Sequence, residues 1–210
     1  MPGKVIAVVQ QKGGSGKTTL AANLAVACLR RGMRVALLDT DPQGSLGRWF
    51  MTRRERLGDA GLEFSTSSAW GVAYECEKLR KTADLVIVDT PPKVDADLRP
   101  ALREADLVLV PVASSHVDLW ATDGVLDLAA RERKSAWLVL NRTRAGTRLV
   151  DEVAAAAAAL TAGVTQARLA NRVVYAETLG QGLGAVEAGH AAARAEVGAL
   201  TDEVLGLLDA

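Results

Sequence analysis

The sequence has few aromatic residues and few cysteines. Aromatic side chains account for 4% of the 210 residues, so the core must be built mainly from the aliphatic part of the 49% that is hydrophobic. The two cysteines, Cys28 and Cys76, lie far apart and form no C-x-x-C pair. Cys28 sits among apolar, helix-forming residues, which predicts a buried thiol. This cysteine usage fits a reducing cytosol, so we expect a cytoplasmic protein.

The sequence also lacks an excess of charge of either sign. It contains 25 Lys and Arg against 25 Asp and Glu, which gives a formal net charge of zero. The overall charge therefore predicts no nucleic-acid partner, and a site for one must be a local patch. No apolar run is long enough to span a membrane, and nothing near Met1 resembles a signal peptide. Residues 1–210 contain no evident long repeat and are expected to form one domain.

The most informative segment of the sequence is a glycine-rich stretch near its start. The apolar run Val5 to Val9 leads directly into Gln-Gln-Lys-Gly-Gly-Ser-Gly-Lys-Thr-Thr, residues 10–19, and helix-forming residues follow. A strand, a glycine-rich turn and a helix in this order predict a loop whose backbone N–H groups surround a phosphate chain. Lys17 would reach the β- and γ-phosphates, and the Thr18 hydroxyl would hold Mg²⁺. The usual first glycine of such loops is replaced by Gln11, and Lys12 is an additional lysine.

Acidic residues follow two buried strands further along the chain. A strand at 34–38 ends in Asp39-Thr40-Asp41, and a strand at 85–88 ends in Asp89. Ligands of open α/β sheets bind at the carboxyl ends of the strands. In phosphate-loop enzymes a carboxylate at the end of a second apolar strand holds Mg²⁺, which is the role expected of Asp89.

The remaining pattern alternates apolar strands with helices. This alternation predicts a doubly wound, mostly parallel α/β sheet flanked by helices. Further strands are expected at 62–64, 107–112, 136–141 and 164–167, and helices at 70–81, 98–105, 119–133, 147–161 and 191–208. Residues 114–118, which include His116, are expected to form a loop without a catalytic role. Residues 171–184 contain three glycines and are expected to form a flexible turn.

Three motifs together resemble those of the deviant Walker-box ATPases of the MinD/ParA superfamily, and in particular the small ParA-type partition ATPases. They are Lys-Gly-Gly-Ser-Gly-Lys-Thr at 12–18, Asp-Thr-Asp-Pro-Gln at 39–43 and Val-Asp-Thr-Pro-Pro at 88–92. The resemblance covers nearly the whole chain, and its later stretches are looser matches. It implies that no N-terminal helix-turn-helix precedes the sheet, because the first strand begins near Val5.

The resemblance also implies roles for the matching residues in a weak ATP hydrolase that a partner stimulates. The residues expected to bind ATP are Lys12, Gly13, Gly14, Ser15, Gly16, Lys17, Thr18, Thr19, Asn141 and Arg142. Magnesium would be held by Thr18, Asp39 and Asp89. Lys12, Lys17 and Asp41 would be catalytic: Asp41 would position the attacking water, and Lys12 would reach the ATP of a second subunit. Asn141 resembles a residue that contacts adenine.

Partners are implied in the same way. The resemblance implies a homodimer with two ATP molecules between the subunits, non-specific DNA binding that places the protein on the nucleoid, and an adaptor that stimulates hydrolysis. The adaptor would be a centromere-binding protein on a plasmid or chromosome, or would belong to a protein assembly such as a carboxysome or a chemoreceptor cluster. The arginines considered for DNA contact are Arg142, Arg144, Arg148, Arg168 and Arg172.

Other readings are less well supported by the sequence. A membrane-bound regulator of the MinD type needs a basic amphipathic C-terminal helix, but residues 201–210 are acidic. We therefore expect no membrane partner. Enzymes that activate carboxylates with a similar loop, such as those resembling dethiobiotin synthetase, lack the Asp-x-Asp-Pro-Gln motif in this form. Iron–sulfur relatives need cysteines at defined loops, and Cys28 and Cys76 fall elsewhere.

Overall fold

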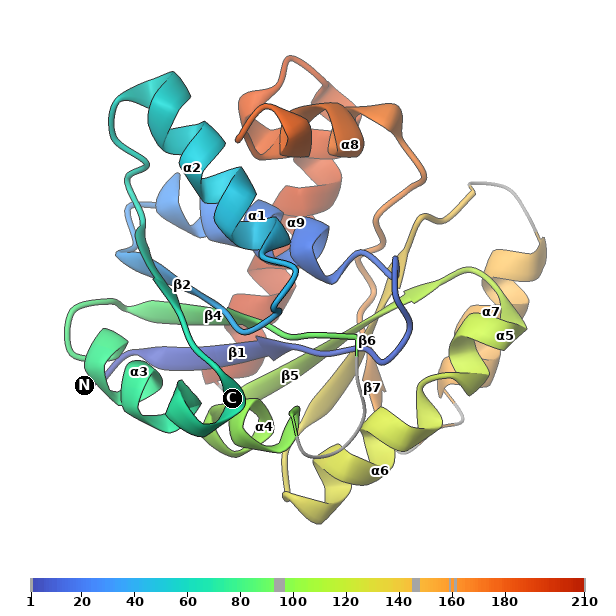
Figure 1. Cartoon of the computed structure of the whole chain (residues 1–210). Helices are drawn as coiled ribbons and strands as arrows, with labels where there is room; N and C mark the ends of the chain where they lie inside the picture. The colour runs from blue at the N-terminus through green and yellow to red at the C-terminus, as the bar shows by residue number, and fades with distance from the viewer. Residues whose placement is uncertain (1, 93–96, 145–147, 159, 161, 210) are drawn as a thin grey trace.

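The computed structural model describes residues 2–92, 97–144, 148–158, 160 and 162–209. Within them, seven parallel strands form one sheet of order β3-β2-β4-β1-β5-β6-β7, as Figure 1 shows. The strands are β1 (Lys4–Val8), β2 (Val35–Asp39), β3 (Glu63–Thr66), β4 (Leu85–Asp89), β5 (Leu107–Ala113), β6 (Ala136–Asn141) and β7 (Gly163–Val164). The fold predicted from the alternation of apolar strands and helices is confirmed, and the observed pairing is parallel throughout.

Helices cover both faces of the sheet. One face carries α1 (Lys17–Leu29), α2 (Ser45–Leu57), α8 (Val173–Gly180), the short 3₁₀ helix η2 (Ala185–Glu187) and α9 (Ala191–Asp209). The other carries α3 (Val72–Leu79), which follows the 3₁₀ turn η1 (Ala69–Gly71), and also α4 (Arg99–Glu104), α5 (His116–Trp120), α6 (Asp123–Arg131) and α7 (Arg148–Ala158). The chain thus forms three layers with the sheet in the middle.

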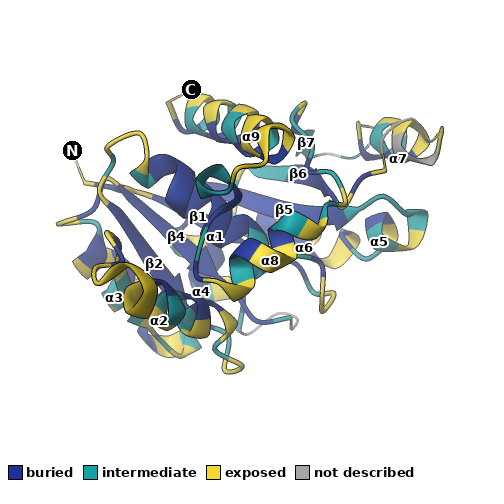
Figure 2. Ribbon diagram, turned by 90° about the horizontal axis from the view of Figure 1, so that it is seen from above, coloured by how far each residue is buried: buried dark blue, intermediate teal, exposed yellow. Residues whose placement is uncertain are grey.

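Burial on both faces explains why the strands are apolar without interruption. In β1, Ile6 and Val8 pack into the core under α1, whereas Val5 and Ala7 pack into the core on the opposite face. A parallel sheet covered on both sides requires apolar side chains at every position of its central strands. Figure 2 shows these strands and most of α1 as buried, while the outer sides of α7 and α9 carry exposed residues.

Beyond its first turn, helix α1 is apolar on all sides except at Asn23, because it lies between the sheet and other helices. Its residues from Leu20 to Cys28 are all buried, and many of them are alanines. Small side chains let α9 and η2 approach α1 closely on the side away from the sheet. The position of α1, and hence of the loop that precedes it, is therefore fixed by packing on all sides.

Several element predictions are wrong in detail. The predicted loop at 114–118 contains the start of α5, because the Ser115 side chain caps this helix by accepting a hydrogen bond from the Asp118 N–H, 3.1 Å away. The predicted helix at 119–133 is divided between α5 and α6. The predicted strand at 164–167 is reduced to β7, residues 163–164. Within the helix expected at 147–161, the structure contains α7, which runs from Arg148 to Ala158. Residues 147, 159 and 161 lie outside the described residues.

The segment expected to be a flexible turn contains helix α8. Two of its three glycines serve close packing, since a Cβ at Gly182 would clash with the backbone of Arg53, and one at Gly184 would meet the side chain of Val26. Cys28 is buried as predicted, and Cys76 on α3 is buried as well. In the part of the chain that the structure describes, no helix is both long enough and apolar enough to cross a membrane.

Candidate functional site at the carboxyl edge of the sheet

The register of the central strands brings the sequence motifs to one edge. Asp89 at the end of β4 is paired with Val8 at the end of β1 on one side and with Asp39 at the end of β2 on the other. The loop of residues 9–16 leaves β1 at this edge and enters α1 at Lys17. Both predicted acidic motifs therefore lie beside the glycine-rich loop, as their placement after strands predicted.

The backbone of the loop adopts the conformation that its glycines allow. Gly14 and Gly16 have φ angles of 73° and 95°, in the left-handed region that disfavours other residues. Gly16 caps α1, and no side chain of the described residues caps this helix end by a hydrogen bond. The first N–H groups of α1 and its positive dipole end are therefore available to an anion.

A cavity of about 280 Å³ lies against this loop. Its walls combine the loop, the start of α1, the motif that follows β2, and residues that are distant in sequence. The lining residues are Gly13, Gly14, Gly16, Lys17, Thr18, Thr19, Asp41, Gln43, Ser45, Pro92, Arg142 and Leu179. Most of the predicted phosphate-binding residues are thus brought together around one cavity. Ser15 is buried beneath it, and Lys12 is not among the described residues that line it.

Thr18 and Asp89 form the centre of the site. The Thr18 hydroxyl donates a hydrogen bond to Asp89 Oδ2 over 2.6 Å, and the other carboxylate oxygen, Oδ1, is buried without a hydrogen-bond partner among the described residues. Burial raises the pKa of Asp89 to about 7, although the bond from Thr18 and the charge of Lys17 act in the opposite direction. Burial likewise lowers the pKa of Lys17, which is 7% exposed, against the attraction of Asp89 and Asp41.

An orphaned carboxylate oxygen beside a hydroxyl is a donor set that suits Mg²⁺. This ion binds few protein oxygens and completes its octahedron with water and phosphate. In the described part of the chain, no group of three or more His, Cys, Asp or Glu residues could hold a metal by protein ligands alone. Thr18 and Asp89 therefore fit a magnesium ion that shares its ligands with a nucleotide.

The two carboxylates after β2 have different environments. Asp39 accepts hydrogen bonds from the backbone N–H groups of Asp41 and Gly47, each over 3.0 Å, so both of its oxygens hold the following loop. Asp41 is half-buried, accepts a bond from the Gln43 N–H and lines the cavity. Both oxygens of Asp39 are thus hydrogen-bonded to the loop that follows β2, whereas Asp41 faces the cavity. The magnesium role expected of Asp39 stays a prediction.

Lys12 points to a different part of the molecule. Its ammonium group forms an ion pair with Asp118 on α5, and Asp118 also accepts a hydrogen bond from the Ser115 hydroxyl. Burial acts to raise the pKa of Asp118, but the bonds from Lys12 and Ser115 outweigh this effect and lower it. The Lys12 side chain is 44% exposed, so this lysine lies at the surface beside the cavity.

The side chain of Asn141 stabilises the glycine-rich loop through a hydrogen bond. Its side-chain Nδ2 donates to the Ser15 carbonyl over 3.0 Å, and its Oδ1 accepts from the Arg142 N–H over 2.8 Å. A Cβ at Gly16 would clash with the same amide. Because both ends of the amide are used within the protein, Asn141 braces the glycine-rich loop. The contact with adenine that the resemblance implies stays a prediction.

A second cavity of about 470 Å³ adjoins the first. The two share Thr19, Arg142 and Leu179, and the second is lined further by Asn141, Ala170, Asn171, Arg172, Val173, Tyr175 and Ala176. Sequence reasoning missed the wall that α8 provides, because the glycines after it indicated a turn. The spacing of Val174, Tyr175, Thr178 and Leu179, three and four residues apart, was the available signal for an amphipathic helix.

The arginines considered for DNA contact do not form an uncompensated positive patch. Arg148, Arg168 and Arg172 form ion pairs with Glu152, Asp151 and Glu196, at 3.7, 3.4 and 2.6 Å. Arg142 lines both cavities at the loop, and Arg144 is exposed. The acidic partners reduce the net charge that this region could offer to a phosphate backbone.

Comparison with known proteins identifies the family. Residues 6–176 match the model of the CobQ/CobB/MinD/ParA nucleotide binding domain. The chain is 30% identical over 190 residues to the Maintenance of carboxysome distribution protein A of Halothiobacillus neapolitanus, covering 88% of this chain and 87% of that protein. It is 36% identical over 151 residues to the Chromosome-partitioning ATPase Soj of Thermus thermophilus, covering 60% of this chain and 59% of that protein.

Solved structures agree with the fold. An ATP complex of a McdA variant from Cyanothece superposes with a TM-score of 0.79 at 17% identity, covering 97% of this chain and 96% of that one. The cell division ATPase MinD of Pyrococcus furiosus gives a TM-score of 0.79 at 20% identity, covering 98% and 99%. By sequence and by fold, the chain belongs to the CobQ/CobB/MinD/ParA family of nucleotide-binding domains and is an ATPase domain of the ParA/MinD type.

Proposed function

We propose that the protein is a positioning ATPase: ATP joins two copies, the dimer holds to DNA on the nucleoid, and a partner on the cargo triggers hydrolysis and release. The observation that carries this proposal is the pair of lysines in one loop. Lys17 lies in the cavity, whereas Lys12 stands outside it at the surface. Because Lys17 already serves the phosphates of its own loop, a second lysine at the surface is placed to act on the nucleotide of another subunit.

The nucleotide would occupy the two adjoining cavities. The triphosphate would lie against Gly13 to Thr18 in the smaller cavity, with Lys17 on its β- and γ-phosphates. The base and ribose would fill the larger cavity beside Tyr175 and Leu179 of α8. Magnesium would be held by Thr18 and Asp89, and when bound it supplies the positive charge that offsets the charge of the phosphates. Asp41 would orient the attacking water.

The dimer would place Lys12 on the partner's γ-phosphate. There a cation can stabilise the charge of the transferring group from across the interface, as an arginine finger does. Lys12 would first have to leave Asp118. The same short helix exposes Val117 and Trp120, which are 62% and 67% exposed, and apolar side chains beside a released lysine suit a surface that becomes buried.

Two kinds of cargo are supported by different relatives. The similarity to a carboxysome distribution protein covers 87% of that relative and favours a protein assembly as cargo. The similarity to Soj covers 59% of that relative and favours a plasmid or chromosome, with a centromere-binding partner. In either case we propose a single ATPase domain over residues 1–210, in the cytoplasm, that uses non-specific DNA as its track and no membrane.

The decisive experiment compares Lys12→Ala with the wild type in ATP and in ADP. Sedimentation should show an ATP-dependent dimer for the wild type that Lys12→Ala loses together with partner-stimulated hydrolysis, while ATP still binds. Lys4→Ala, which removes another exposed lysine from the opposite end of β1, is the matched control and should behave as wild type. A Lys12→Ala variant that dimerises and hydrolyses normally excludes the cross-subunit role.

Two further measurements separate the other parts of the proposal. Asp41→Ala should trap the ATP dimer, because binding is retained and the water is no longer oriented; failure to dimerise contradicts that assignment. Binding to unrelated duplex DNA should require ATP and fall steeply with salt, as expected of phosphate contacts. Intact ATP dimers that bind no DNA at any salt concentration would show that the track is another surface.

A further inference from the structure

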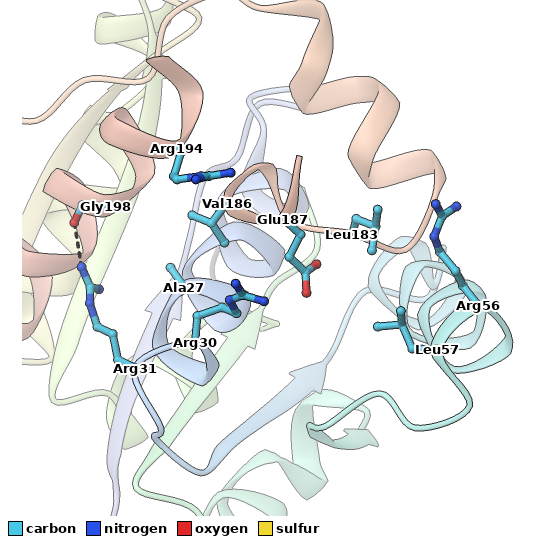
Figure 3. Close-up of a pocket in the computed structure, with 10 residues that line it drawn as sticks. All are labelled: Ala27, Arg30, Arg31, Arg56, Leu57, Leu183, Val186, Glu187, Arg194 and Gly198. Carbon is cyan, nitrogen blue, oxygen red and sulfur yellow. Dashed lines mark hydrogen bonds between the residues drawn. The ribbon is translucent and has the colours of Figure 1, made fainter. Parts of the chain in front are cut away.

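A second charged cavity lies at the end of α1 remote from the phosphate loop. It has a volume of about 580 Å³, and four arginines surround it, as Figure 3 shows. Arg30 and Arg31 follow the last residue of α1, Arg56 lies near the end of α2, and Arg194 belongs to the first turn of α9. Three separate helices thus contribute guanidinium groups to one cavity.

The positive charge of this cavity exceeds the negative charge near it, although the charge of Arg30 contributes to lowering the pKa of Glu187. Glu187 is the one carboxylate among the described lining residues, and both of its oxygens are bound by Arg53, at 2.7 and 2.9 Å. Arg31 pairs with Asp202, and Arg194 donates to the Ala188 carbonyl. Throughout the described ranges, neither of the two remaining arginines, Arg30 and Arg56, has a side-chain hydrogen bond or an ion pair. Gathered like charges repel one another, and an anion would relieve that repulsion.

Compensation of helix dipoles explains only part of this arrangement. A cation near a helix C-terminus interacts favourably with the helix dipole. This interaction explains the positions of Arg30 at the end of α1 and Arg56 at the end of α2. Arg194 lies at the opposite kind of helix end, where the N-terminal dipole is positive and a cation is unfavourable. Its guanidinium nevertheless reaches over the cavity in Figure 3. The dipole therefore does not explain the position of Arg194. Its bond to the Ala188 carbonyl uses one N–H group, and the other guanidinium N–H groups are left to bind an anion.

Part of the lining of the cavity is apolar. This part, which we call the apolar floor, consists of Ala27 of α1, Leu57 of α2, and Leu183 and Val186 of the segment before α9, and Figure 3 shows these side chains among the arginines. Leu57 is 46% exposed, so a ligand in the cavity could cover apolar surface that solvent now reaches. A ligand that fits these walls therefore has an anionic group and an apolar body.

We propose that this four-arginine cavity, formed by Arg30, Arg31, Arg56 and Arg194 over an apolar floor, binds a small organic phosphate. The planar fork of a guanidinium matches phosphate oxygens two at a time, and the volume lies in the range of small-ligand pockets. The 13 residues of α1 separate it from the phosphate loop by about 20 Å, so the nucleotide in the loop does not reach it. A DNA duplex could touch the rim but would leave the apolar floor empty.

The test is calorimetric titration of phenyl phosphate into the whole protein, with saturating Mg·ADP present to fill the phosphate loop. Wild type should bind phenyl phosphate more tightly than inorganic phosphate, because the ring covers the floor. The double variant Arg30→Ala/Arg194→Ala should bind it at least about tenfold more weakly, the effect expected when charge-assisted hydrogen bonds are lost. Neither arginine is buried, and circular dichroism should confirm an unchanged fold.

The matched control is Arg54→Ala, which removes an exposed arginine of α2 that is not among the described residues lining the cavity. It should leave phenyl phosphate binding unchanged. Absence of binding to wild type overturns the proposal, as does equal binding by wild type and the double variant. The proposal is also overturned if duplex DNA binding depends on these arginines while phenyl phosphate does not bind. That result would assign the cavity to a nucleic-acid surface. These outcomes are independent of whether ATP drives dimerisation.

Discussion

Replacing Arg53 by alanine should be among the most destabilising single changes outside the nucleotide site. Arg53 lies on α2, is 2% exposed, and makes four hydrogen bonds that connect three segments of the chain. It donates to the carbonyls of Ala60 and Gly182, at 2.9 and 3.1 Å, and to both oxygens of Glu187. Alanine would leave Glu187 half-buried without its cation and would orphan the two carbonyls.

Breaking one side of a buried ion pair costs about 3–5 kcal/mol, because the remaining charge stays in a poor solvent. For a chain of this size each kcal/mol lowers Tm by about 2–4 °C, so Arg53→Ala should lower Tm by about 6–20 °C. Thermal unfolding followed by circular dichroism measures this directly. Arg54→Ala, which removes the exposed neighbour on the same helix, should change the free energy of unfolding by less than about 0.5 kcal/mol. An Arg53→Ala variant within about 1 kcal/mol of wild type, the worth of one ordinary hydrogen bond, would refute the reasoning.

The ion pair between Arg53 and Glu187 should make the stability of the protein depend on pH. Burial acts to raise the pKa of Glu187, but the bonds from Arg53 and from the Gly184 N–H outweigh it, so this pKa lies below its ordinary value of 4.5. The pair therefore stabilises the protein at neutral pH and loses this contribution as the pH falls through the lowered pKa. The difference in Tm between wild type and Glu187→Gln should shrink below about pH 4.5. A difference that stays constant down to acid unfolding would show that the ion pair is not its source.

Two further changes address the loop. Gly16→Ala should weaken ATP binding at least about tenfold, because the left-handed φ costs about 1–2 kcal/mol and the new Cβ clashes with Asn141; equilibrium dialysis measures it, and unchanged affinity would show that the loop can shift. Asp118→Asn should free Lys12 and lower the protein concentration at which ATP-dependent dimers form, while changing stability by less than about 1 kcal/mol, as expected of a partly exposed ion pair. Sedimentation checks this, and weaker dimerisation would mean that Asp118 supports the dimer.

The sequence predicted the sheet and the nucleotide edge well because both depend on local features. Apolar strands such as β4 are buried on both faces, so their composition identifies them without knowledge of their neighbours. The loop at 12–18 and Asp89 follow directly from strand ends, and parallel pairing alone brings strand ends together. In these parts of the site, the same few residues determine both which chemical groups are present and where they lie in the fold.

The remaining parts depend on contacts between distant residues. The sequence did not indicate that Asp39 accepts a hydrogen bond from the Gly47 N–H, eight residues later. Asn141 is 126 residues from the Ser15 carbonyl that it braces, and Arg53 is 134 residues from Glu187. The spacing of residues along the chain does not predict hydrogen bonds between residues so far apart. The sequence therefore shows a polar residue at each of these positions but not the contact that it makes.

The glycine-rich segment before α9 shows why composition alone was misleading. Asn23 is 1% exposed on an otherwise apolar helix; its Nδ2 donates to the Thr19 carbonyl over 2.8 Å, and its Oδ1 accepts from the Ala185 N–H over 2.7 Å. A buried amide with both ends satisfied holds its two partners in a fixed relation, because breaking either bond leaves an unpaired polar group. Asn23 thus ties the segment after α8 to the first turn of α1, which directly follows the phosphate loop. The wall of the larger cavity is therefore positioned from α1, and two of the glycines that indicated flexibility, Gly182 and Gly184, are the residues that allow the close approach.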